Sequence, residues 1–226
     1  MPKKNEVDKA GLAKRKRLAA KIAKKLRELY PDAGCSLEHH TPFELLVATI
    51  LSAQCTDVQV NKVTPALFKK FPTVMAFAES PIASIEKAIK STGFYHNKAK
   101  NIKAACQMIL ERFRGEVPDT MEMLTSLPGV GRKTANVVLG NAFGRNEGFV
   151  VDTHVFRLSH RMDLADGTTP EKVEQQLMPI FPQADWAWLS HALVLHGRGP
   201  CKARKPDCEN CRLNNFCPRI GVQNGS

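Results

Sequence analysis

The chain has 226 residues, of which 43% are hydrophobic, enough for one large domain or two smaller lobes with a core. Its 33 Lys and Arg residues outnumber 22 Asp and Glu residues, which gives a formal net charge of +11. No apolar stretch approaches the length of a membrane span, and the first apolar residues alternate with lysines. We therefore expect neither a membrane anchor nor a signal peptide.

The positive charge is concentrated in the first 29 residues. This segment holds eleven Lys and Arg residues against three acidic ones, and the rest of the chain is only mildly basic. Such an arm favours a polyanion, most simply nucleic acid, because phosphate contacts release counterions. The alternative is a solvated helix face that aids solubility. An apolar stripe predicts that the second half of the arm docks as a helix, through Leu18, Ile22, Leu26 and Leu29.

The pattern of caps and apolar residues predicts helices along the rest of the chain. Thr41-Pro42-Phe43-Glu44 is a capping box with proline at the first helical position, followed by an apolar run. Periodic segments, each ended by a glycine, cover 82–91 and 97–114. Further helices are expected at 121–127, 134–143, from Thr169 onward, and at 184–196. The only strand-like run, Phe149–Val151, is too short to make a sheet, so we expect an all-α fold.

A glycine-rich turn lies between two of these expected helices, in the sequence Leu127-Pro128-Gly129-Val130-Gly131-Arg132-Lys133-Thr134-Ala135. A Gly-x-Gly turn lets backbone N–H groups converge on an anion, and the following helix adds its positive dipole end. Gly129 and Gly131 are therefore expected to hold a DNA phosphate whatever the base sequence. The flanking proline, Lys-Thr pair and helices indicate a helix–hairpin–helix motif. A purely structural tight turn is the alternative.

Four of the seven cysteines crowd together with the spacing C-x6-C-x2-C-x5-C, at Cys201, Cys208, Cys211 and Cys217. Clustered thiolates form disulfides or bind zinc or an iron–sulfur cluster. Disulfides are disfavoured, since an odd cysteine count without a signal peptide suits a reducing compartment. A four-cysteine zinc site usually pairs two C-x2-C hairpins, and only one is present. The wide, unequal gaps better fit a 4Fe–4S cluster, with zinc or no metal as alternatives.

Taken together, these segments resemble the endonuclease III family of bacterial DNA glycosylases with apurinic/apyrimidinic lyase activity. The motifs at 127–139 and 151–157 and the four-cysteine loop follow the family's order and spacing, and the similarity runs from about residue 15 to 218. The resemblance implies two lobes with a DNA groove between them. One is a six-helix barrel at 35–146 that ends in the hairpin. The other is a 4Fe–4S cluster domain at 147–226, joined by the basic arm and helix of residues 1–34.

Two residues within these motifs carry the expected chemistry. Cleaving a base from deoxyribose needs a nucleophile at the anomeric carbon, and a lysine amine can also form the Schiff base that permits β-elimination. A free lysine has a pKa near ~10.4, so a nucleophilic lysine needs its ammonium disfavoured. A helix N-terminus, Arg132 and a partly dry cleft would all do so for Lys133. Asp152 opens a helix, so it is an N-cap, a catalytic carboxylate or both.

The resemblance assigns roles to these two residues and to several DNA contacts. It implies that Lys133 is the nucleophile and that Asp152 assists its deprotonation and stabilises the cationic sugar. A phosphate-contacting lysine and a structural cap are the alternatives. Gln54 matches a residue that enters the space left by the flipped nucleotide, and Phe94 matches an apolar wedge, commonly leucine in the family. His96 is a candidate contact to the orphaned base, with a solvated loop histidine as the alternative.

Basic residues also fall inside the first cysteine loop, at Lys202, Arg204 and Lys205. A cluster-stiffened basic loop would grip phosphate, with random surface charge as the alternative. For Gln54 the alternative is an amide in a surface turn. We expect a monomer that acts on damaged double-stranded DNA, without a membrane, in the bacterial cytoplasm at the nucleoid.

These observations predict a base-excision-repair glycosylase that removes oxidised pyrimidines, such as thymine glycol and 5-hydroxycytosine, and then cleaves the strand. The nearest alternative is the sister family that removes adenine opposite 8-oxoguanine. That family shares the cluster and the hairpin but typically has serine where this chain has Lys133, and it has a C-terminal recognition domain that is not found after residue 218. A non-catalytic helix–hairpin–helix protein is the other alternative, and the coexistence of Lys133 and Asp152 argues against it.

Overall fold

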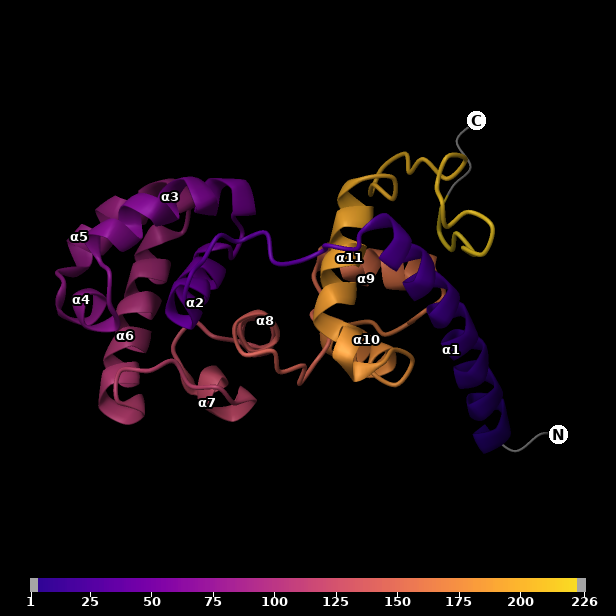
Figure 1. Cartoon of the computed structure of the whole chain (residues 1–226), viewed down its shortest axis with the longest axis horizontal. Helices are drawn as coiled ribbons and strands as arrows, with labels where there is room; N and C mark the ends of the chain where they lie inside the picture. The colour runs from indigo at the N-terminus through magenta and orange to yellow at the C-terminus, as the bar shows by residue number, and fades with distance from the viewer. Residues whose placement is uncertain (1–3, 223–226) are drawn as a thin grey trace. The chain divides into compact units, whose positions relative to one another are not determined.

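The computed structural model of the chain describes residues 4–222, with side chains from residue 9 onward (Figure 1). Within this range no residue lies in a β-strand, and the expected all-α fold is confirmed. None of the described helices is both long and apolar enough to cross a membrane. The chain divides into two compact units. One is Cys35–Glu147, and the other combines the described residues up to Gly34 with those from Gly148 onward.

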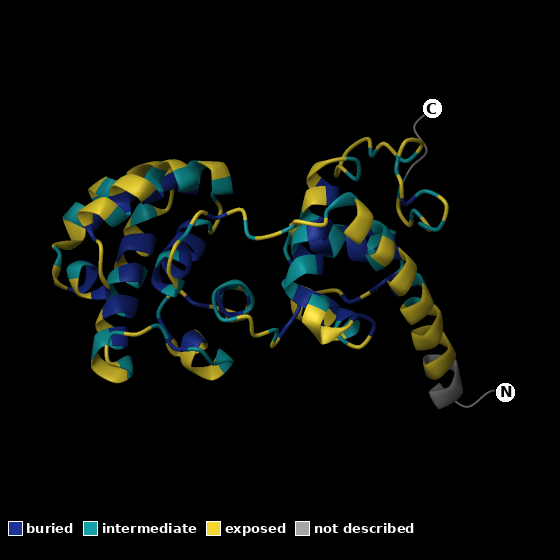
Figure 2. Cartoon of the chain, viewed as in Figure 1, coloured by how far each residue is buried: buried dark blue, intermediate teal, exposed yellow. Residues whose placement is uncertain are grey.

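The unit Cys35–Glu147 packs its helices around α2, which is apolar and buried along nearly its whole length (Figure 2). A helix that is hydrophobic all round belongs in a core, and α2 contacts α3, α6 and α8. The elements of this unit are α2 (Pro42–Leu51), α3 (Asp57–Lys70), α4 (Val74–Glu79), α5 (Ile82–Ile89), η1 (a 3-10 turn, Lys90–Thr92), α6 (Tyr95–Phe113), α7 (Met121–Ser126) and α8 (Arg132–Ala142).

The second unit has its own apolar core, formed by helices from both ends of the chain. Its elements are α1 (Lys4–Leu29), α9 (Thr153–Arg161), α10 (Pro170–Leu177), η2 (Gln183–Asp185) and α11 (Trp186–Arg198), followed by the cysteine loop. Ile22 and Leu26 of α1 are fully buried in this core, as their stripe predicts. Arg15 of α1 also pairs with Asp166 at 2.8 Å. The second half of the arm is therefore a docked helix.

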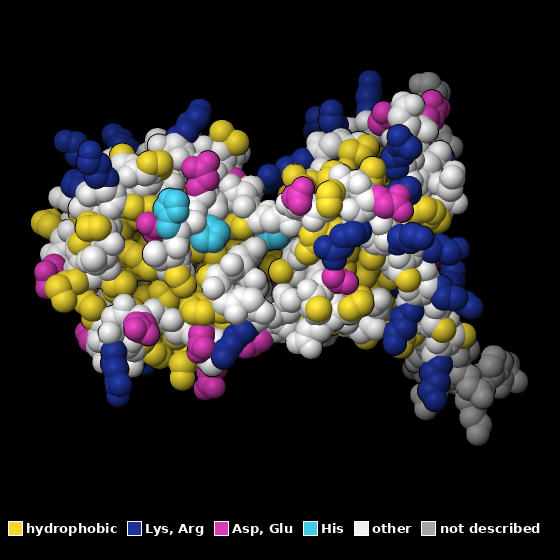
Figure 3. Space-filling view, viewed as in Figure 1, with side chains coloured by type: hydrophobic (Ala, Val, Ile, Leu, Met, Phe, Trp, Pro, Cys, Tyr) yellow, Lys and Arg dark blue, Asp and Glu magenta, His cyan; other side chains and the backbone are white. Residues whose placement is uncertain are grey.

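The outer face of α1 carries exposed cations, among them Lys16, Arg17, Lys21 and Lys24, while the exposed Lys14 and Arg27 pair with Asp163 and Asp185. Figure 3 shows Lys and Arg side chains gathered over this helix. The cations nearest the start of the arm, Lys3 and Lys4, fall outside the described side chains. The exposed face is thus open to a polyanion, while the opposite face fixes the helix to its unit.

Threonine side chains start several of these helices. In α2, α3, α4, α7 and α10 a threonine Oγ1 accepts a hydrogen bond from the backbone N–H three residues later, at 3.1–3.3 Å. The capping box before α2 differs from the expected form in one bond. The Glu44 carboxylate accepts from the backbone N–H of His40 at 2.6 Å, one residue before the Thr41 cap. The cap still fixes the start of the central helix.

Candidate functional site

The Gly-x-Gly turn joins α7 to α8 and depends on its first glycine. Gly129 has a φ of 79°, and a Cβ at this position would approach Cβ of Asn101 in α6 to 2.8 Å. Only glycine combines that backbone conformation with such a close approach. The Val130 N–H donates to the carbonyl of Leu127 at 3.1 Å and closes the turn. Asn101 therefore packs directly against the turn that is expected to hold phosphate.

Gly131 has a different task, because its φ of −90° is open to any residue and its Cβ position is empty. It is the N-cap of α8, and no side chain caps the first turn of this helix. The first backbone N–H groups of an α-helix have no partner within the helix. With no capping side chain in the way, this turn has the arrangement that binds phosphate at a helix N-terminus.

Lys133 is the second residue of α8 and is exposed. Its position in the first helical turn follows the sequence prediction, and the positive end of the helix dipole disfavours a cation there. The neighbouring Arg132 is also exposed. The amine is thus presented at the surface of the unit Cys35–Glu147, next to the hairpin.

Asp152 lies in the other unit and is the N-cap of α9. Its Oδ1 accepts hydrogen bonds from the backbone N–H groups of His154 and Val155, both at 2.8 Å. Both of these capping bonds go to Oδ1, and among the described residues of its own unit no donor to the second oxygen, Oδ2, is found. The residue is half-buried. One oxygen therefore satisfies the helix, and the other remains available for chemistry, so the two roles considered for Asp152 are compatible.

Gln54 and Phe94 adopt the same unusual backbone conformation in two different loops. Their φ values are 52° and 48°, in the left-handed region that non-glycine residues rarely occupy. Strain of this kind persists only where the surroundings determine it, and it clusters at ligand sites. Both side chains are exposed, Phe94 to 64%. Together with Gly129 they line one open pocket of about 170 Å³, whose remaining lining residues are Ile50, Ala53, Asn97, Lys98 and Asn101.

His96 follows Phe94 by two residues but is not among the residues that line this pocket. Its Nδ1 lies 2.8 Å from Oε1 of Glu86, and its ring stacks against Tyr95 with 4.1 Å between ring centroids. The structure therefore gives His96 partners within its own unit. Sequence reasoning did not single out Lys98, which lies in the same pocket and is almost completely buried.

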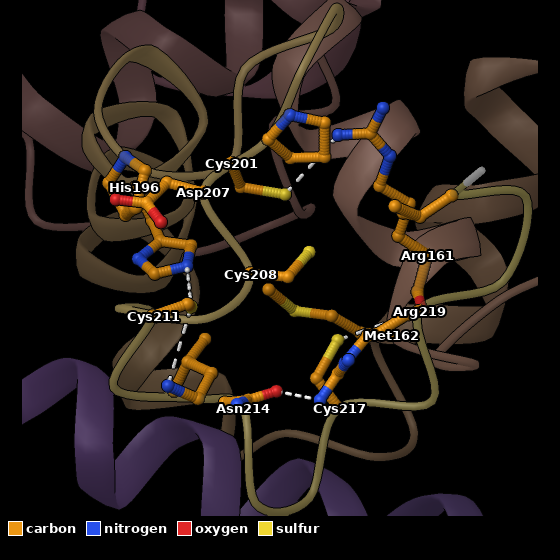
Figure 4. Close-up of a pocket in the computed structure, with 14 residues that line it drawn as sticks. Arg161, Met162, His196, Cys201, Asp207, Cys208, Cys211, Asn214, Cys217 and Arg219 are labelled. Carbon is orange, nitrogen blue, oxygen red and sulfur yellow. Dashed lines mark hydrogen bonds between the residues drawn. The ribbon is translucent and has the colours of Figure 1, made fainter. Parts of the chain in front are cut away.

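The four clustered cysteines surround one pocket in the second unit (Figure 4). Polar groups of the chain reach three of the sulfurs, and one of these, Cys217 Sγ, lies 3.9 Å from the carbonyl oxygen of Arg161. Nη1 of Arg161 donates to Sγ of Cys201 at 3.5 Å, and Nε2 of the buried His196 lies 3.4 Å from Sγ of Cys211. The backbone N–H of Leu213 also donates to Cys211 Sγ, at 3.4 Å. The loop thus brings four thiols and several hydrogen-bond donors to one space.

Two arginines of α9, which sequence reasoning did not single out, hold this loop in place. Arg161 donates to the carbonyls of Lys202 and Ala203 at 2.7 and 2.8 Å. Arg157 donates to the carbonyls of Gly197 and Cys201, both at 2.9 Å. These bonds fix the backbone of the first cysteine loop. Its basic side chains remain exposed, as a phosphate grip requires: Lys202, Arg204 and Lys205.

The donor set, four free cysteine sulfurs around one pocket, suits a metal centre held by thiolates. Burial, with the charge of neighbouring thiolates, raises the pKa of the Cys211 and Cys217 thiols. Four ionised sulfurs in this space therefore need a positively charged group between them, as iron in an iron–sulfur cluster provides.

The fold and these sites define a helix–hairpin–helix DNA glycosylase with an iron–sulfur domain. Residues 47–183 match the model of the HhH-GPD superfamily of base excision DNA repair proteins, and residues 201–217 match the iron–sulfur binding domain of endonuclease III. The chain is 55% identical to endonuclease III of Synechocystis sp., over 92% of this chain and 94% of that protein. It is 45% identical to endonuclease III of Escherichia coli, over 90% and 95%.

A solved endonuclease III–DNA complex is also similar, with a TM-score of 0.86 and 43% identity over 90% of this chain and 95% of that one. The chain belongs to the endonuclease III family. It is a base-excision-repair DNA glycosylase with apurinic/apyrimidinic lyase activity, and DNA is its substrate. Its cofactor is a 4Fe–4S cluster, as the cysteine spacing predicts.

Replacing Cys208 with serine should lower the yield of folded protein and weaken DNA binding. The cluster ties the loop 201–217 into one unit, and without it the segment keeps fewer anchors, chiefly the buried Leu213 and the bonds to the α9 arginines. The purified wild-type protein should contain about four iron and four acid-labile sulfide atoms per chain. Cys35→Ser, outside the loop, is the matched control and should keep the wild-type content of iron and sulfide. Stoichiometric zinc without iron, in protein from iron-replete cells, would overturn the assignment.

Proposed function

We propose that this protein excises oxidised pyrimidines, such as thymine glycol and 5-hydroxycytosine, from damaged duplex DNA and then cleaves the strand by β-elimination. The main support for this proposal is that the chain contains the two groups that the reaction requires. A lysine lies in the first turn of the helix after the phosphate-binding hairpin, and a carboxylate has one oxygen outside its capping bonds. In the proposed reaction both act on the same deoxyribose.

The proposed first step is displacement of the base. Nζ of Lys133, as the neutral amine, forms a bond to C1′ of the sugar, and the bond from C1′ to the base nitrogen breaks. The electron pair leaves with the base, which takes up a proton. Oδ2 of Asp152 accepts the proton that the lysine must lose, and the carboxylate charge stabilises positive charge on the sugar. The hairpin amides and Lys202, Arg204 and Lys205 hold phosphates and keep the strand in register.

The proposed second step is strand cleavage. Opening of the sugar ring converts the adduct into a Schiff base between Lys133 and C1′, and this cation acidifies the proton on C2′. Loss of that proton expels the 3′ phosphate with the electron pair of its C3′–O bond. Water then hydrolyses the Schiff base and restores the lysine. Neither the base nor its sugar carbon can be reached in stacked DNA, so the lesion must first leave the helix.

Gln54 and Phe94 are proposed to occupy the duplex when the lesion leaves it. Phe94 offers an exposed apolar ring to the base stack, and Gln54 offers hydrogen bonds to the orphaned base. Their shared pocket and left-handed backbone support a ligand-contacting role. His96, already bonded to Glu86, is proposed as a secondary contact. The protein is proposed to act as a monomer, since one chain supplies both catalytic groups, and to associate with the bacterial nucleoid through its basic α1 face.

Borohydride trapping tests this function directly. Duplexes that contain thymine glycol, 5-hydroxycytosine, or adenine opposite 8-oxoguanine are incubated with the protein and sodium borohydride. The two pyrimidine lesions should give a covalent protein–DNA adduct and, without borohydride, a strand cut by β-elimination. Preferential release of adenine with an intact abasic strand would instead assign the sister activity. Binding to all duplexes without any excision would overturn the proposed substrate class.

A further inference from the structure

We propose that Lys98 is a positioning residue that joins the two loops carrying Gln54 and Phe94 and holds them ready to enter the duplex. The inference rests on the proposed function, because it takes those two residues as the ones that replace the flipped nucleotide. It adds Lys98, a buried residue of α6, which is proposed to touch neither the reacting atoms nor a DNA phosphate.

Lys98 is only 4% exposed, and its ammonium is held by two backbone carbonyls. Nζ donates to the carbonyl of Leu51 at 2.7 Å and to that of Thr92 at 2.8 Å. Leu51 is the last residue of α2, and Thr92 is the last residue of η1. Carbonyls at the C-terminal end of a helix lack partners within the helix and carry partial negative charge. One ammonium therefore caps two helical segments that are far apart in the sequence.

Each of these capped ends leads directly into one of the proposed intercalating loops. Gln54 follows Leu51 by three residues, and Phe94 follows Thr92 by two. Both have the left-handed backbone described above, which the surrounding structure must impose. Because Lys98 fixes the starting point of both loops, it also fixes the distance between Gln54 and Phe94. Rigid placement of such residues lowers the ordering cost when DNA binds.

The burial of Lys98 carries an energetic cost that its two capping bonds must offset. Within the described structure no carboxylate pairs with its ammonium. Burial lowers the pKa of this lysine, as expected for a cation removed from water without a counter-ion. An apolar residue of similar length would avoid that cost but would leave the carbonyls of Leu51 and Thr92 without this donor. The lysine also lines the same pocket as Gln54, Phe94 and Gly129, so it lies where the loops meet the hairpin.

The test compares Lys98→Met with Lys103→Met, a matched control on the same helix. Lys103 makes a similar bond, from Nζ to the carbonyl of Ser80 at 2.6 Å, but Ser80 lies in neither loop. Single-turnover rates are measured on a thymine-glycol duplex and on a duplex with a preformed abasic site. Lys98→Met should lose about tenfold or more in excision, the scale of a lost charged hydrogen bond, and much less in lyase cutting. Lys103→Met should change neither rate appreciably.

A merely structural lysine would lower both rates together or neither, and either outcome for Lys98→Met would overturn the proposal. If Lys98→Met does not fold, Lys98→Gln, which keeps an amide donor, should show a smaller loss with the same bias toward excision. Hydrogen exchange of residues 52–56 and 91–95 should become faster in the Lys98 variants and not in Lys103→Met. Unchanged exchange in both segments would overturn the proposal as well.

Phe94→Ala, measured alongside, separates this inference from the function on which it rests. If Phe94→Ala affects excision selectively and Lys98→Met does not, the positioning role alone is wrong. If Phe94→Ala affects both substrates equally, the proposed wedge is wrong and the inference falls with it.

Discussion

Lys133→Ala should abolish covalent trapping on abasic DNA and lower base excision by several orders of magnitude, as removal of a covalent nucleophile does in other enzymes. Affinity for duplex DNA should fall by less than about tenfold, because only one cation is lost and the backbone N–H groups of the hairpin remain. The measurements are borohydride trapping, single-turnover excision and a binding titration at fixed salt. Arg132→Ala removes the neighbouring exposed cation and is the matched control, which should still trap. A cross-link that survives Lys133→Ala would remove Lys133 from the role of nucleophile.

The partner carboxylate can be tested without disturbing its helix. The two capping bonds of Asp152 use one oxygen, and an asparagine carbonyl can accept both of them. Asp152→Asn should therefore keep the thermal stability and DNA affinity of the wild type, while turnover falls by roughly 10²–10⁴-fold. Asp152→Ala should in addition lose about 1 kcal/mol of stability with the cap. Wild-type turnover in Asp152→Asn would leave the residue with a capping role alone.

The helices of this chain could be predicted from sequence where caps and apolar periodicity agree, and not where they conflict. α3 shows such a conflict. Thr56 caps it, but Pro65 lies inside it, and one of its buried positions is the polar Thr64. A proline normally ends or kinks a helix, so the apolar stripe of α3 appears interrupted in the sequence. α4 has only six residues, too few to show a 3.6-residue period, and unlike the equally short α7 it has no glycine-rich turn beside it to mark its end.

The residues of the site fall into two groups in the same way: those marked by a local sequence pattern, and those that depend on contacts between distant segments. The hairpin glycines, the cysteine spacing and the carboxylate at the start of α9 are local patterns with their own chemistry. The contact between Gly129 and Asn101, and the bonds from Lys98 to Leu51 and Thr92, join segments that meet only after α2, α6 and the hairpin have packed. No spacing rule predicts which distant carbonyl a buried lysine will reach. Residues that position a site are therefore harder to predict than those that perform its chemistry.

Phe94→Ala should slow excision of thymine glycol from duplex DNA far more than it slows cutting at a preformed abasic site. The reason is that only the first reaction must unstack a base and keep the gap filled behind it. A base stacked on an aromatic ring gains about 1–3 kcal/mol, which corresponds to a loss of roughly 5- to 150-fold when the ring is removed. The ring is 64% exposed, so its removal should leave the melting temperature almost unchanged.

The choice of replacement matters because of the backbone at this position. Glycine would relieve the left-handed conformation of Phe94 and loosen the loop, whereas alanine removes the ring and keeps a Cβ. Phe94→Leu should retain much of the wild-type rate, since an apolar side chain can still enter the stack. Gln54→Ala should cause a smaller loss that varies with the base opposite the lesion, as expected for hydrogen bonds to that base. Equal losses for Phe94→Ala on both substrates would mean that the ring only supports its own loop, and excision would then need another residue to fill the space left by the lesion.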